Sequence, residues 1–536
     1  MRRIGRSLGR RRGLWAVAVL VIAGTVLAVA RRNVEEKLRG RDSDPDGSRS
    51  GAQADPQSDS GSGWSALDGS RRGSRRHGNA GLSRAQRLLL SNCNAAPDSE
   101  IDSDSVRALR VAWEFRADGP VSHDPLVAGN RLYTADWGGS VYCLDVTTGR
   151  ELWTSRLGRP ESDWPWHGFA GTGALGDELL LEASAEGTIY ALDPDNGDVV
   201  WERTFTSNPN AGNAGRLLCH GGMVFVPVQS VEEALAETVP GFQPSFRGHV
   251  VALDERTGET VWDLPLVDQD HDGVAVWTGF ALDPEEGTLF FATGNNYTGE
   301  ATELSDSLVA VDARTGKVRW HRQVTDNDVW TMAQPIGPDA DFTGAPQLFE
   351  VVVDGENRRL VGAGQKSGVY TVWDRDTGRR VWNATIGFGE VGGGIHSEPS
   401  VTVDRLLIWS NNSFAFKDPE GHPMNVAALH PANGGYVWMN REIQPAAVRT
   451  SGFLAGDLYF VPSLDGRVRA YRADDGEPVW TSGSHDSIAS SVKVAGGMLF
   501  FGTGVPESFG GDGGAGSVVA YRLVQEGLVQ RAGWGE

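Results

Sequence analysis

One short phrase recurs seven times along the chain and restricts the folds open to it. The clearest copy is ALDERTGETVW, from Ala252 to Trp262. It indicates a strand, a tight turn and a second strand, because Gly258 takes a positive φ at no steric cost and Asp254 can hydrogen-bond forward to the turn backbone. The Trp that follows the Asp by eight residues offers a large flat surface to bury.

The other copies keep a Trp four residues after the Gly. They end at Trp153, Trp201, Trp320, Trp382, Trp438 and Trp480. Successive tryptophans of the seven copies are separated by 42 to 62 residues. A repeat of about this length is typical of units that bury their hydrophobic faces only against neighbouring units. The chain is therefore expected to fold as a radial repeat protein.

The two ends of the repeat region predict how such a ring closes. Leu109 to Phe115 has the pattern of a strand with no turn phrase before it, whereas Gly516 to Leu523 has the pattern of strands with no Trp strand after them. Pairing the two ends would leave no open edge between the first and last units. We therefore expect an all-β, eight-bladed β-propeller, and the alternative is a seven-bladed ring with a free final hairpin.

The first 32 residues indicate export. Six arginines precede a 17-residue apolar run, Leu14 to Ala30, which ends in the Ala-Val-Ala of a signal-peptidase site. The run is at the short end of the ~17–25 residues that cross a bilayer, so a cleaved signal peptide and an uncleaved membrane anchor remain alternatives. The more positive flank places residue 1 inside and the bulk of the chain outside the cytoplasm, in the periplasm, on the cell surface or secreted.

Composition divides the rest of the chain into three parts. Residues 33–97 are mostly rich in Ser, Gly, Asp and Arg, which indicates a disordered tether. Residues 98–523 hold the expected propeller, and residues 524–536 form a tail. The cysteines allow one disulfide but form no haem-attachment or zinc motif; they are Cys93, Cys143 and Cys219.

The charge balance argues against one class of partner. The chain carries a formal charge of −21, residues 33–536 alone carry −29, and the whole sequence has five lysines. Nucleic-acid binding needs a basic face to meet the phosphates, so nucleic acid is not an expected partner. An acidic surface suits an exported protein and a salty milieu equally well.

The repeated phrase resembles the tryptophan-docking motif of dehydrogenases that use pyrroloquinoline quinone (PQQ), which are eight-bladed propellers. Gly273 to Gly299 and Ser305 to Trp330 resemble the centre of these enzymes almost continuously. Ser230 to Asp254 and Gly337 to Pro346 are most similar to the polyvinyl-alcohol dehydrogenase branch. The resemblance, which covers Val106 to Leu523, implies oxidation of an alcohol, secondary and polymeric ones included. It also implies an external electron acceptor, such as a cytochrome or a quinone.

The resemblance further implies a site for the cofactor. PQQ is a planar tricarboxylate o-quinone, so it needs a flat apolar ring to lie on, cations for its carboxylates and a hard metal ion. Trp277 matches the aromatic platform of the family, and Lys366 matches its basic residue beside the quinone. Arg247 lies in the matching Phe-Arg-Gly sequence and is the second candidate cation.

The metal expected in such a site is calcium or a lanthanide, which takes oxygen ligands. Asn295 matches the amide ligand of the family, and Glu232 or Glu233 matches its carboxylate ligand. Taken singly, each of these residues has an ordinary structural explanation, such as a turn or an exposed charge pair. Their shared order along the chain favours a PQQ pocket.

The expected catalytic base departs from the family pattern. Thr331 stands where the alcohol dehydrogenases place their catalytic Asp, and a Thr hydroxyl has no accessible pKa for taking an alcohol proton. Asp328 is the candidate base in its place, and Asp339 and Asp341 are the alternatives. The family's adjacent cysteine pair is also absent, because Gln243 to Ser245 occupies that position.

A second hypothesis comes from a different class of protein. His396 stands where the family tends to place a Trp, and a damaged site would suit a non-catalytic PQQ-like propeller. Such a protein would be a protein- or polymer-binding scaffold of the cell envelope, resembling the outer-membrane assembly propeller lipoprotein. That class predicts degraded site loops and a lipidation cysteine. This chain keeps long, motif-bearing loops and has no cysteine at the end of the apolar run.

Overall fold

The structure is a computed structural model that describes residues 90–157, 167–334, 336–389, 393–412, 422–445, 450–506 and 513–524. All of them lie within one compact unit, 84–536. The expected signal or anchor at 14–30 and the tether upstream of residue 90 fall outside the described residues. No helix in the described part is long and apolar enough to cross a membrane.

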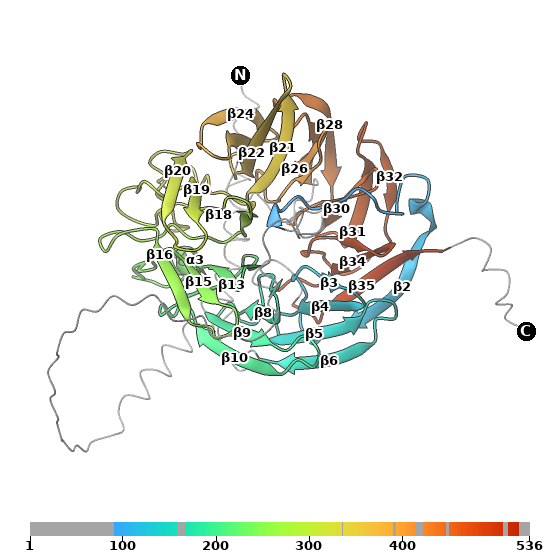
Figure 1. Ribbon diagram of the computed structural model, residues 1–536, viewed down its shortest axis with the longest axis horizontal. Helices are drawn as coiled ribbons and strands as arrows, with labels where there is room; N and C mark the ends of the chain where they lie inside the picture. The colour runs from blue at the N-terminus through green and yellow to red at the C-terminus, as the bar shows by residue number, and fades with distance from the viewer. Residues whose placement is uncertain are drawn as a thin grey trace, which may run out of the picture. The chain divides into compact units, whose positions relative to one another are not determined.

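Eight of the nine sheets in the described residues are arranged as blades around a central axis (Figure 1). Seven of these sheets have four strands and one has five, and within each blade consecutive strands pair antiparallel from the axis outward. This architecture confirms the eight-bladed propeller predicted from the repeat. Each hairpin alternates the faces of its side chains, so both faces of a blade pack against the neighbouring blades.

The first four blades follow one another along the chain. Blade 1 consists of β3 (Leu126–Ala128), β4 (Arg131–Ala135), β5 (Ser140–Asp145) and β6 (Glu151–Arg156). Blade 2 consists of β7 (Ala174–Leu175), β8 (Leu180–Ala183), β9 (Thr188–Leu192) and β10 (Val199–Thr204). Blade 3 consists of β12 (Leu218–His220), β13 (Met223–Pro227), β15 (His249–Asp254) and β16 (Thr260–Pro265). Blade 4 consists of β17 (Ala281–Asp283), β18 (Thr288–Ala292), β19 (Ser307–Asp312) and β20 (Val318–Gln323).

The other four blades complete the ring. Blade 5 consists of β21 (Gln347–Val353), β22 (Glu356–Gly364), β23 (Val369–Asp374) and β24 (Arg380–Thr385). Blade 6 consists of β25 (Ser400–Val401), β26 (Leu406–Asn411), β27 (His422–Leu429) and β28 (Tyr436–Gln444). Blade 7 consists of β29 (Phe453–Ala455), β30 (Leu458–Ser463), β31 (Arg467–Arg472) and β32 (Pro478–Thr481). Blade 8 consists of β33 (Lys493–Ala495), β34 (Met498–Gly502), β35 (Ser517–Leu523) and β2 (Leu109–Arg116).

The repeated phrase forms the junctions between blades. Trp201 of blade 2 lies against Gly258 in the turn of blade 3, where a Cβ on the glycine would come within 2.6 Å of the indole ring. The Trp201 indole N–H donates to the carbonyl oxygen of Glu255 in the same turn at 2.9 Å. The same contact recurs at seven junctions, through Trp113, Trp153, Trp201, Trp262, Trp320, Trp382 and Trp438. Any side chain larger than hydrogen would displace the indole, which explains the Gly in every copy.

Blade 8 closes the ring with strands from both ends of the repeat region. β2 pairs antiparallel with β35, and the register places Leu109 opposite Leu523 and Phe115 opposite Val518. This is the pairing predicted from the unmatched strands in the sequence. Closure by the first outer strand removes the open edge that a free terminal blade would expose.

A segment in front of β2 follows the inner edges of several blades. This strap, Leu90–Ala108, contains β1 (Ala95–Ala96), which pairs in parallel with β29, and the short 3-10 turn η2 (Val106–Ala108). Strap carbonyl oxygens accept hydrogen bonds from the backbone N–H groups of Leu348, Val401, Leu454 and Gly456, which belong to blades 5, 6 and 7. In Figure 1 the blue β1 lies near the centre of the ring, and the chain runs outward from it to β2. Part of the range assigned to the tether, 33–97, is thus built into the ring.

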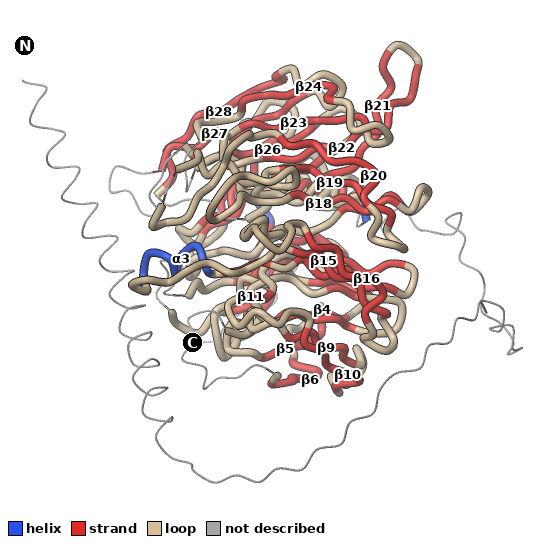
Figure 2. The backbone as a smooth tube through the Cα atoms, turned by 90° about the vertical axis from the view of Figure 1, so that its left-hand side faces the viewer, coloured by secondary structure: helices blue, strands red, loops and turns tan. Residues whose placement is uncertain are grey.

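Two small elements lie outside the blades. The ribbon of β11 (Ala211–Gly212) and β14 (Gln229–Ser230) leads into α3 (Glu232–Thr238). Seen from the side in Figure 2, α3 lies at one face of the ring. The three cysteines are free thiols, so no disulfide forms among them.

Candidate functional site

The long connections of blades 3, 4 and 5 gather at one end of the axis. In an antiparallel blade, the loop between the second and third strands lies at the same end as the connection that enters the next blade. Residues 228–248, 293–306 and 365–368 are loops of the first kind, and residues 266–280 and 324–346 are connections of the second kind. The candidate residues of the sequence analysis lie on these five segments.

Lys366 is the centre of a buried charge cluster on these loops. Its Nζ lies 2.5 Å from Oδ1 of Asp339 and 2.7 Å from Oδ2 of Asp341. The same Nζ lies 5.6 Å from the ring centroid of Trp277 and 5.8 Å from that of Trp330. The ammonium group is thus held by two carboxylates and faces two indole rings, an arrangement that stabilises the charged form.

Carboxyl groups outnumber cations in this cluster. Burial and the nearby charge of Asp341 raise the pKa of Glu233 and of Asp306 well above the usual range. Burial also raises the pKa of Asp328, and it raises that of Asp339 to about 7 even though the Lys366 ammonium opposes the shift. Burial by itself would lower the pKa of Lys366, but the carboxylates raise it above its usual value. A further cation bound among these crowded carboxyl groups would favour their ionised form, so the cluster suits cation binding.

Asn295 presents an unused ligand atom beside the cluster. Its backbone N–H donates to Oδ1 of Asp341 at 2.9 Å, and its side-chain Nδ2 donates to the carbonyl oxygens of Asn296 at 2.6 Å and Trp330 at 2.9 Å. These bonds fix the amide, yet its Oδ1 is buried without a hydrogen-bond partner among the described residues. Such an atom costs free energy unless something binds it. Oδ2 of Asp339 is also buried and has no hydrogen-bond partner among the described residues.

The two adjacent glutamates of α3 have different environments. Glu232 is fully buried, and its carboxylate accepts five hydrogen bonds, from Asn208, Asn210, the hydroxyl and backbone N–H of Ser245, and the backbone N–H of Phe246. Its oxygens therefore hold the α3 loop in place. Glu233 is partly exposed and interacts electrostatically with Asp341 and Lys366. Of the two, Glu233 has the oxygens available to a metal ion.

The described side-chain hydrogen bonds of Arg247, Asp328 and Thr331 are with the backbone of nearby loops. Arg247 is exposed, and its guanidinium donates to the carbonyl oxygen of Gln269 at 3.0 Å, so no described contact joins it to the Lys366 cluster. Asp328 is buried, and its two oxygens accept backbone N–H groups of the loop, from Asp339 at 3.2 Å and from Ala340 at 2.7 Å. The carboxylate of Asp328 thus fixes the loop that carries Asp339. Thr331 is also buried, and its hydroxyl accepts the N–H of Gln334.

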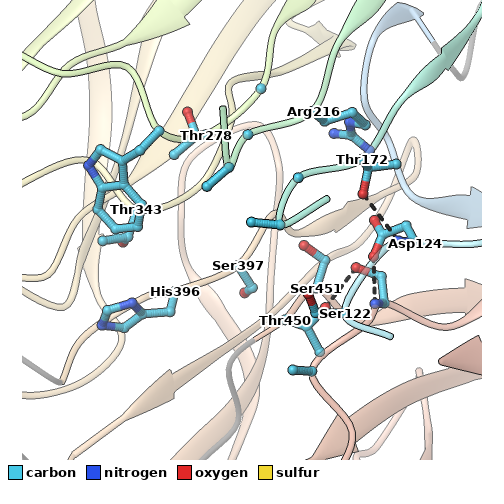
Figure 3. A pocket seen from close by; sticks show the side chains of 18 of the residues that line it. Ser122, Asp124, Thr172, Arg216, Thr278, Thr343, His396, Ser397, Thr450 and Ser451 are labelled. Atoms are coloured by element: carbon cyan, nitrogen blue, oxygen red, sulfur yellow. Dashed lines mark hydrogen bonds between the residues drawn. The ribbon is translucent and has the colours of Figure 1, made fainter. Parts of the chain in front are cut away.

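A cavity of about 340 Å³ lies on the axis, and of the residues around Lys366 only Trp277 lines it. Figure 3 shows this cavity, with Arg216, Thr278 and His396 among the side chains around it. Segments of all eight blades contribute to the lining, which includes Trp137, Arg216 and His396. The ring nitrogen Nε2 of His396 is 2.7 Å from the carbonyl oxygen of Gly393. Arg216 was not predicted, because nothing in the surrounding sequence distinguishes an arginine that faces the axis from a solvated one.

The residues present fit a PQQ-type cofactor and its metal ion. The Trp277 indole borders an axial cavity, the Lys366 ammonium lies over the same indole, and a buried amide oxygen of Asn295 without a partner among the described residues lies next to the carboxylates around Lys366. Within the described ranges no group of three or more His, Cys, Asp or Glu side chains is placed to hold a metal ion. The available ligand set is therefore mixed, one amide oxygen with one carboxylate, and an ion there needs further oxygens from a ligand or from water.

Comparisons with known proteins agree with this arrangement. Residues 267–386 match the family described as "Glucose/ethanol/alcohol dehydrogenase, beta-propeller domain", and residues 108–238 and 422–524 match "Outer membrane protein assembly factor BamB". A polyvinylalcohol dehydrogenase from a Pseudomonas species is 26% identical over 448 residues, which cover 76% of this chain and 69% of that protein.

Solved structures show the same fold. The quinohemoprotein alcohol dehydrogenase ADHIIG of Pseudomonas putida has a TM-score of 0.66 at 19% identity, over 82% of each chain. A europium-containing methanol dehydrogenase has a TM-score of 0.64 at 16% identity, over 81% of this chain and 96% of that one. The chain resembles PQQ-dependent alcohol dehydrogenases in sequence, and it shares the propeller fold of these structures.

Proposed function

We propose that this protein is a PQQ-dependent quinoprotein that oxidises an alcohol outside the cytoplasm. The observation that carries the proposal is that the Lys366 ammonium lies over the Trp277 indole, while Asn295, with its unpartnered Oδ1, is bonded to the same Asp341 that holds Lys366. An axial cavity borders Trp277. The matching dehydrogenase family covers all four residues. The similarity to polyvinylalcohol dehydrogenase extends over most of the chain, so secondary and polymeric alcohols belong among the candidate substrates.

The chain supplies separate groups for the cofactor and its ion. Trp277 would support the quinone plane. Lys366, which is held between Asp339 and Asp341, would donate hydrogen bonds to the quinone oxygens. Oδ1 of Asn295 and the carboxylate of Glu233 would hold the calcium or lanthanide ion. When bound, PQQ supplies an o-quinone that accepts the two electrons released as the alcohol becomes a carbonyl compound.

Asp339 is better placed than Asp328 to take the alcohol proton. The oxygens of Asp328 are occupied by backbone N–H groups, whereas Oδ2 of Asp339 is unpartnered. A pKa of about 7 for Asp339 is in the range that suits a general base near neutral pH. Lys366 orients the other oxygen of Asp339 at 2.5 Å. The base therefore comes from the 337–346 loop and compensates for the absence of a carboxylate at Thr331.

The N-terminal sequence is the basis for placing the protein outside the cytoplasm. The Arg-rich, apolar 14–30 segment would export the ring and either be cleaved or remain as an anchor. The sequence contains no haem-attachment motif. The two electrons would therefore pass to a separate acceptor, such as a cytochrome or a quinone.

A non-catalytic scaffold is the second candidate. It is favoured by one observation: the assembly-factor family matches 108–238 and 422–524, a longer part of the chain than the dehydrogenase family matches. That match leaves out the cluster around Asn295 and Lys366. A scaffold has no need for a buried amide oxygen beside excess carboxylates, so the cluster favours the enzyme.

Reconstitution followed by dye reduction tests the enzyme. Purified protein is loaded with PQQ and either calcium or lanthanum, and dye reduction is measured with ethanol, propan-2-ol and polyvinyl alcohol. We expect turnover with at least one alcohol, dependent on both the cofactor and the metal. An Asp339→Asn protein is the matched control, which should bind PQQ and reduce dye at a background rate. PQQ binding without turnover in the wild type would leave the scaffold as the function.

A further inference from the structure

A second cavity, of about 870 Å³, lies inside the ring toward the end away from the Lys366 cluster. Its wall is formed by the strap and by the innermost strands of blades 1, 2, 3, 7 and 8, and it reaches the turn between β33 and β34 at Gly496 and Gly497. In an antiparallel blade, that first turn lies at the end opposite to the loop between the second and third strands, on which Lys366 is carried. None of the residues assigned to the cofactor or its ion lines this cavity.

Most of the wall is apolar. Its larger apolar side chains include those of Leu126, Leu175, Leu218, Phe453 and Val494. A volume of this size is within the range of cavities that bind small molecules. The carboxylates of Asp98, Glu100 and Asp124 also line it, and the one arginine in the wall, Arg216, is paired with Glu398. The charge of the wall therefore disfavours an anion, and the apolar surface suits an uncharged ligand.

Lys493 is the one lysine in this wall. It is the first residue of β33, its side chain is partly exposed, and its Nζ lies 5.6 Å from the ring centroid of Phe453. Its Nζ makes no hydrogen bond or ion pair with the described residues, whereas Lys366 is held by two carboxylates. The amine of Lys493 is thus available to a ligand in the cavity.

The surroundings of Lys493 favour its uncharged form. Burial lowers the pKa of the Lys493 amine below its usual value, and the positive charge of Arg216 adds to this shift. The carboxylates of Asp124 and Glu398 act in the opposite direction without outweighing burial. The strap carboxylates in the wall also oppose the shift, since negative charge favours the ammonium form. More of this amine is therefore unprotonated near neutral pH than in a solvated lysine, and the unprotonated amine is a nucleophile.

We propose that this cavity binds apolar aldehydes and that Lys493 captures them reversibly as an imine. The apolar wall would receive the hydrocarbon part of the aldehyde, and the amine at its edge would meet the carbonyl carbon. This inference goes beyond the proposed function and does not depend on the cofactor. Oxidation of a primary alcohol, the class of reaction proposed for the other end of the ring, would supply an aldehyde.

The chemistry needs neither an oxidant nor a reductant. The nitrogen lone pair forms a C–N bond to the carbonyl carbon, and the π electrons of the C=O bond move to the oxygen. Proton transfer from nitrogen to oxygen gives a carbinolamine. Loss of the hydroxyl group with the second N–H proton releases one water and leaves the C=N bond. Addition of water reverses each step.

The first test compares two lysines of the same protein. Protein free of PQQ and metal is treated with hexanal and sodium cyanoborohydride, which reduces the imine to a stable amine, and labelling of each lysine is followed by peptide mass spectrometry. Lys317, which is exposed in the turn after β19, is the internal reference. At pH 7.5 we expect Lys493 to be labelled at least about fivefold faster than Lys317, because each unit by which its pKa is lowered raises the unprotonated fraction about tenfold. Labelling of Lys493 no faster than that of Lys317 would overturn the proposal.

The second test asks whether the cavity receives the aldehyde. Propanal and hexanal have the same reacting group and differ by three CH2 groups. Each CH2 that enters the apolar cavity should favour hexanal about fourfold at Lys493, whereas the two aldehydes should label Lys317 at similar rates. Equal rates for the two aldehydes at Lys493 would overturn the proposal, because the amine would then react as a surface group.

A variant tests the same point by narrowing the cavity. Ala495 lines the cavity two residues after Lys493 on β33, so the two side chains leave the strand on the same face. Ala495→Leu should reduce the hexanal preference of Lys493 at least about threefold and leave Lys317 unchanged. Ala128→Leu, at the equivalent position of blade 1, is the matched control, since Ala128 is exposed and does not line the cavity.

Melting curves show whether each variant is folded, and an unchanged hexanal preference in folded Ala495→Leu would overturn the proposal. If Ala495→Leu does not fold, the comparison of propanal with hexanal on the wild type decides alone. Failure of the proposed function would be seen as absent PQQ binding. Failure of this inference would be seen as absent selectivity at Lys493 in protein that holds no cofactor.

Discussion

Replacing Asp306 with Asn should stabilise the protein, and increasingly so as the pH rises. Asp306 is fully buried, and neither of its carboxylate oxygens has a hydrogen-bond partner among the described residues. Burial is the main cause of its raised pKa, and repulsion by Asp341 and Asp328 adds to it. The backbone at this position has φ of 46°, a left-handed conformation that Asn also tolerates. The substitution therefore removes a charge without straining the chain.

The sign and size of the effect follow from this environment. A carboxyl group with a raised pKa in the folded state contributes stability below its unfolded pKa of about 4, and that stability is lost as the pH rises through the folded pKa. Each unit by which the folded-state pKa exceeds the unfolded pKa costs about 1.4 kcal/mol at a pH above both values, and Asn has no charge to bury. We expect Asp306→Asn to raise the free energy of unfolding by about 1–3 kcal/mol at pH 8 and by close to zero at pH 4. For a ring of about 400 residues, that is roughly 1–3 °C in melting temperature.

The assay is thermal unfolding of metal-free protein between pH 4 and pH 8. Asp272→Asn is the matched control, because Asp272 is also buried but both its oxygens accept hydrogen bonds from Thr298, at 2.9 and 2.7 Å. That control should lower the melting temperature at pH 8. An Asp306→Asn protein with a lower melting temperature than the wild type at pH 8, or with an increase that does not change with pH, would refute the reasoning.

Three further predictions address the site and the ring. Glu233→Gln should weaken metal-dependent PQQ binding about tenfold or more at unchanged melting temperature, whereas Glu232→Gln should lower the free energy of unfolding by about 1–3 kcal/mol through its hydrogen bonds. Asp339→Asn should lower kcat about 10²- to 10⁴-fold in the dye assay, as expected for loss of a general base, with PQQ affinity kept. Trp113→Ala should lower the free energy of unfolding by about 3–5 kcal/mol in denaturant titrations, because its indole joins blade 8 to blade 1.

Each of these predictions has an outcome that contradicts it. The prediction for the glutamates is contradicted if Glu232→Gln loses metal binding while Glu233→Gln keeps it. For Asp339 it is near-normal turnover of the Asn variant, which would return the role of base to Asp328. For Trp113 it is a ring as stable as the wild type, which would mean that the closing junction contributes little.

The fold could be predicted because the repeated phrase carries its own packing. A Gly such as Gly258 and the Trp of the preceding blade are parts of one contact, so their spacing in the sequence records the junction. Ring closure by β2 and β35 followed from two unmatched strands. The strap was missed, because Ala95–Ala96 has no alternation of apolar and polar residues and its pairing depends on the exposed inner edge of blade 7.

The sequence predicted which loops carry the site, but it did not predict the direction in which each side chain on those loops points. Trp277, Asn295 and Lys366 lie on loops that the ring brings to one end of the axis, and the structure places them together. Arg247 is on a similar loop, but its side chain is exposed and bonded to Gln269. Arg216 lies just before an inner strand and faces the axis, which only the assembled ring reveals.

Metal-dependent binding of PQQ to purified protein tests the central claim most directly. Calorimetry is performed with calcium or lanthanum on the wild type, on Asn295→Ala and on the control Asn425→Ala. Asn425 lies in blade 6, and its buried amide donates to the carbonyl oxygen of Ile386. The account predicts one PQQ and one metal ion per chain for the wild type and for Asn425→Ala, and at least tenfold weaker binding of both for Asn295→Ala. Binding of PQQ that needs no metal, or that is the same in Asn295→Ala as in the wild type, would contradict it.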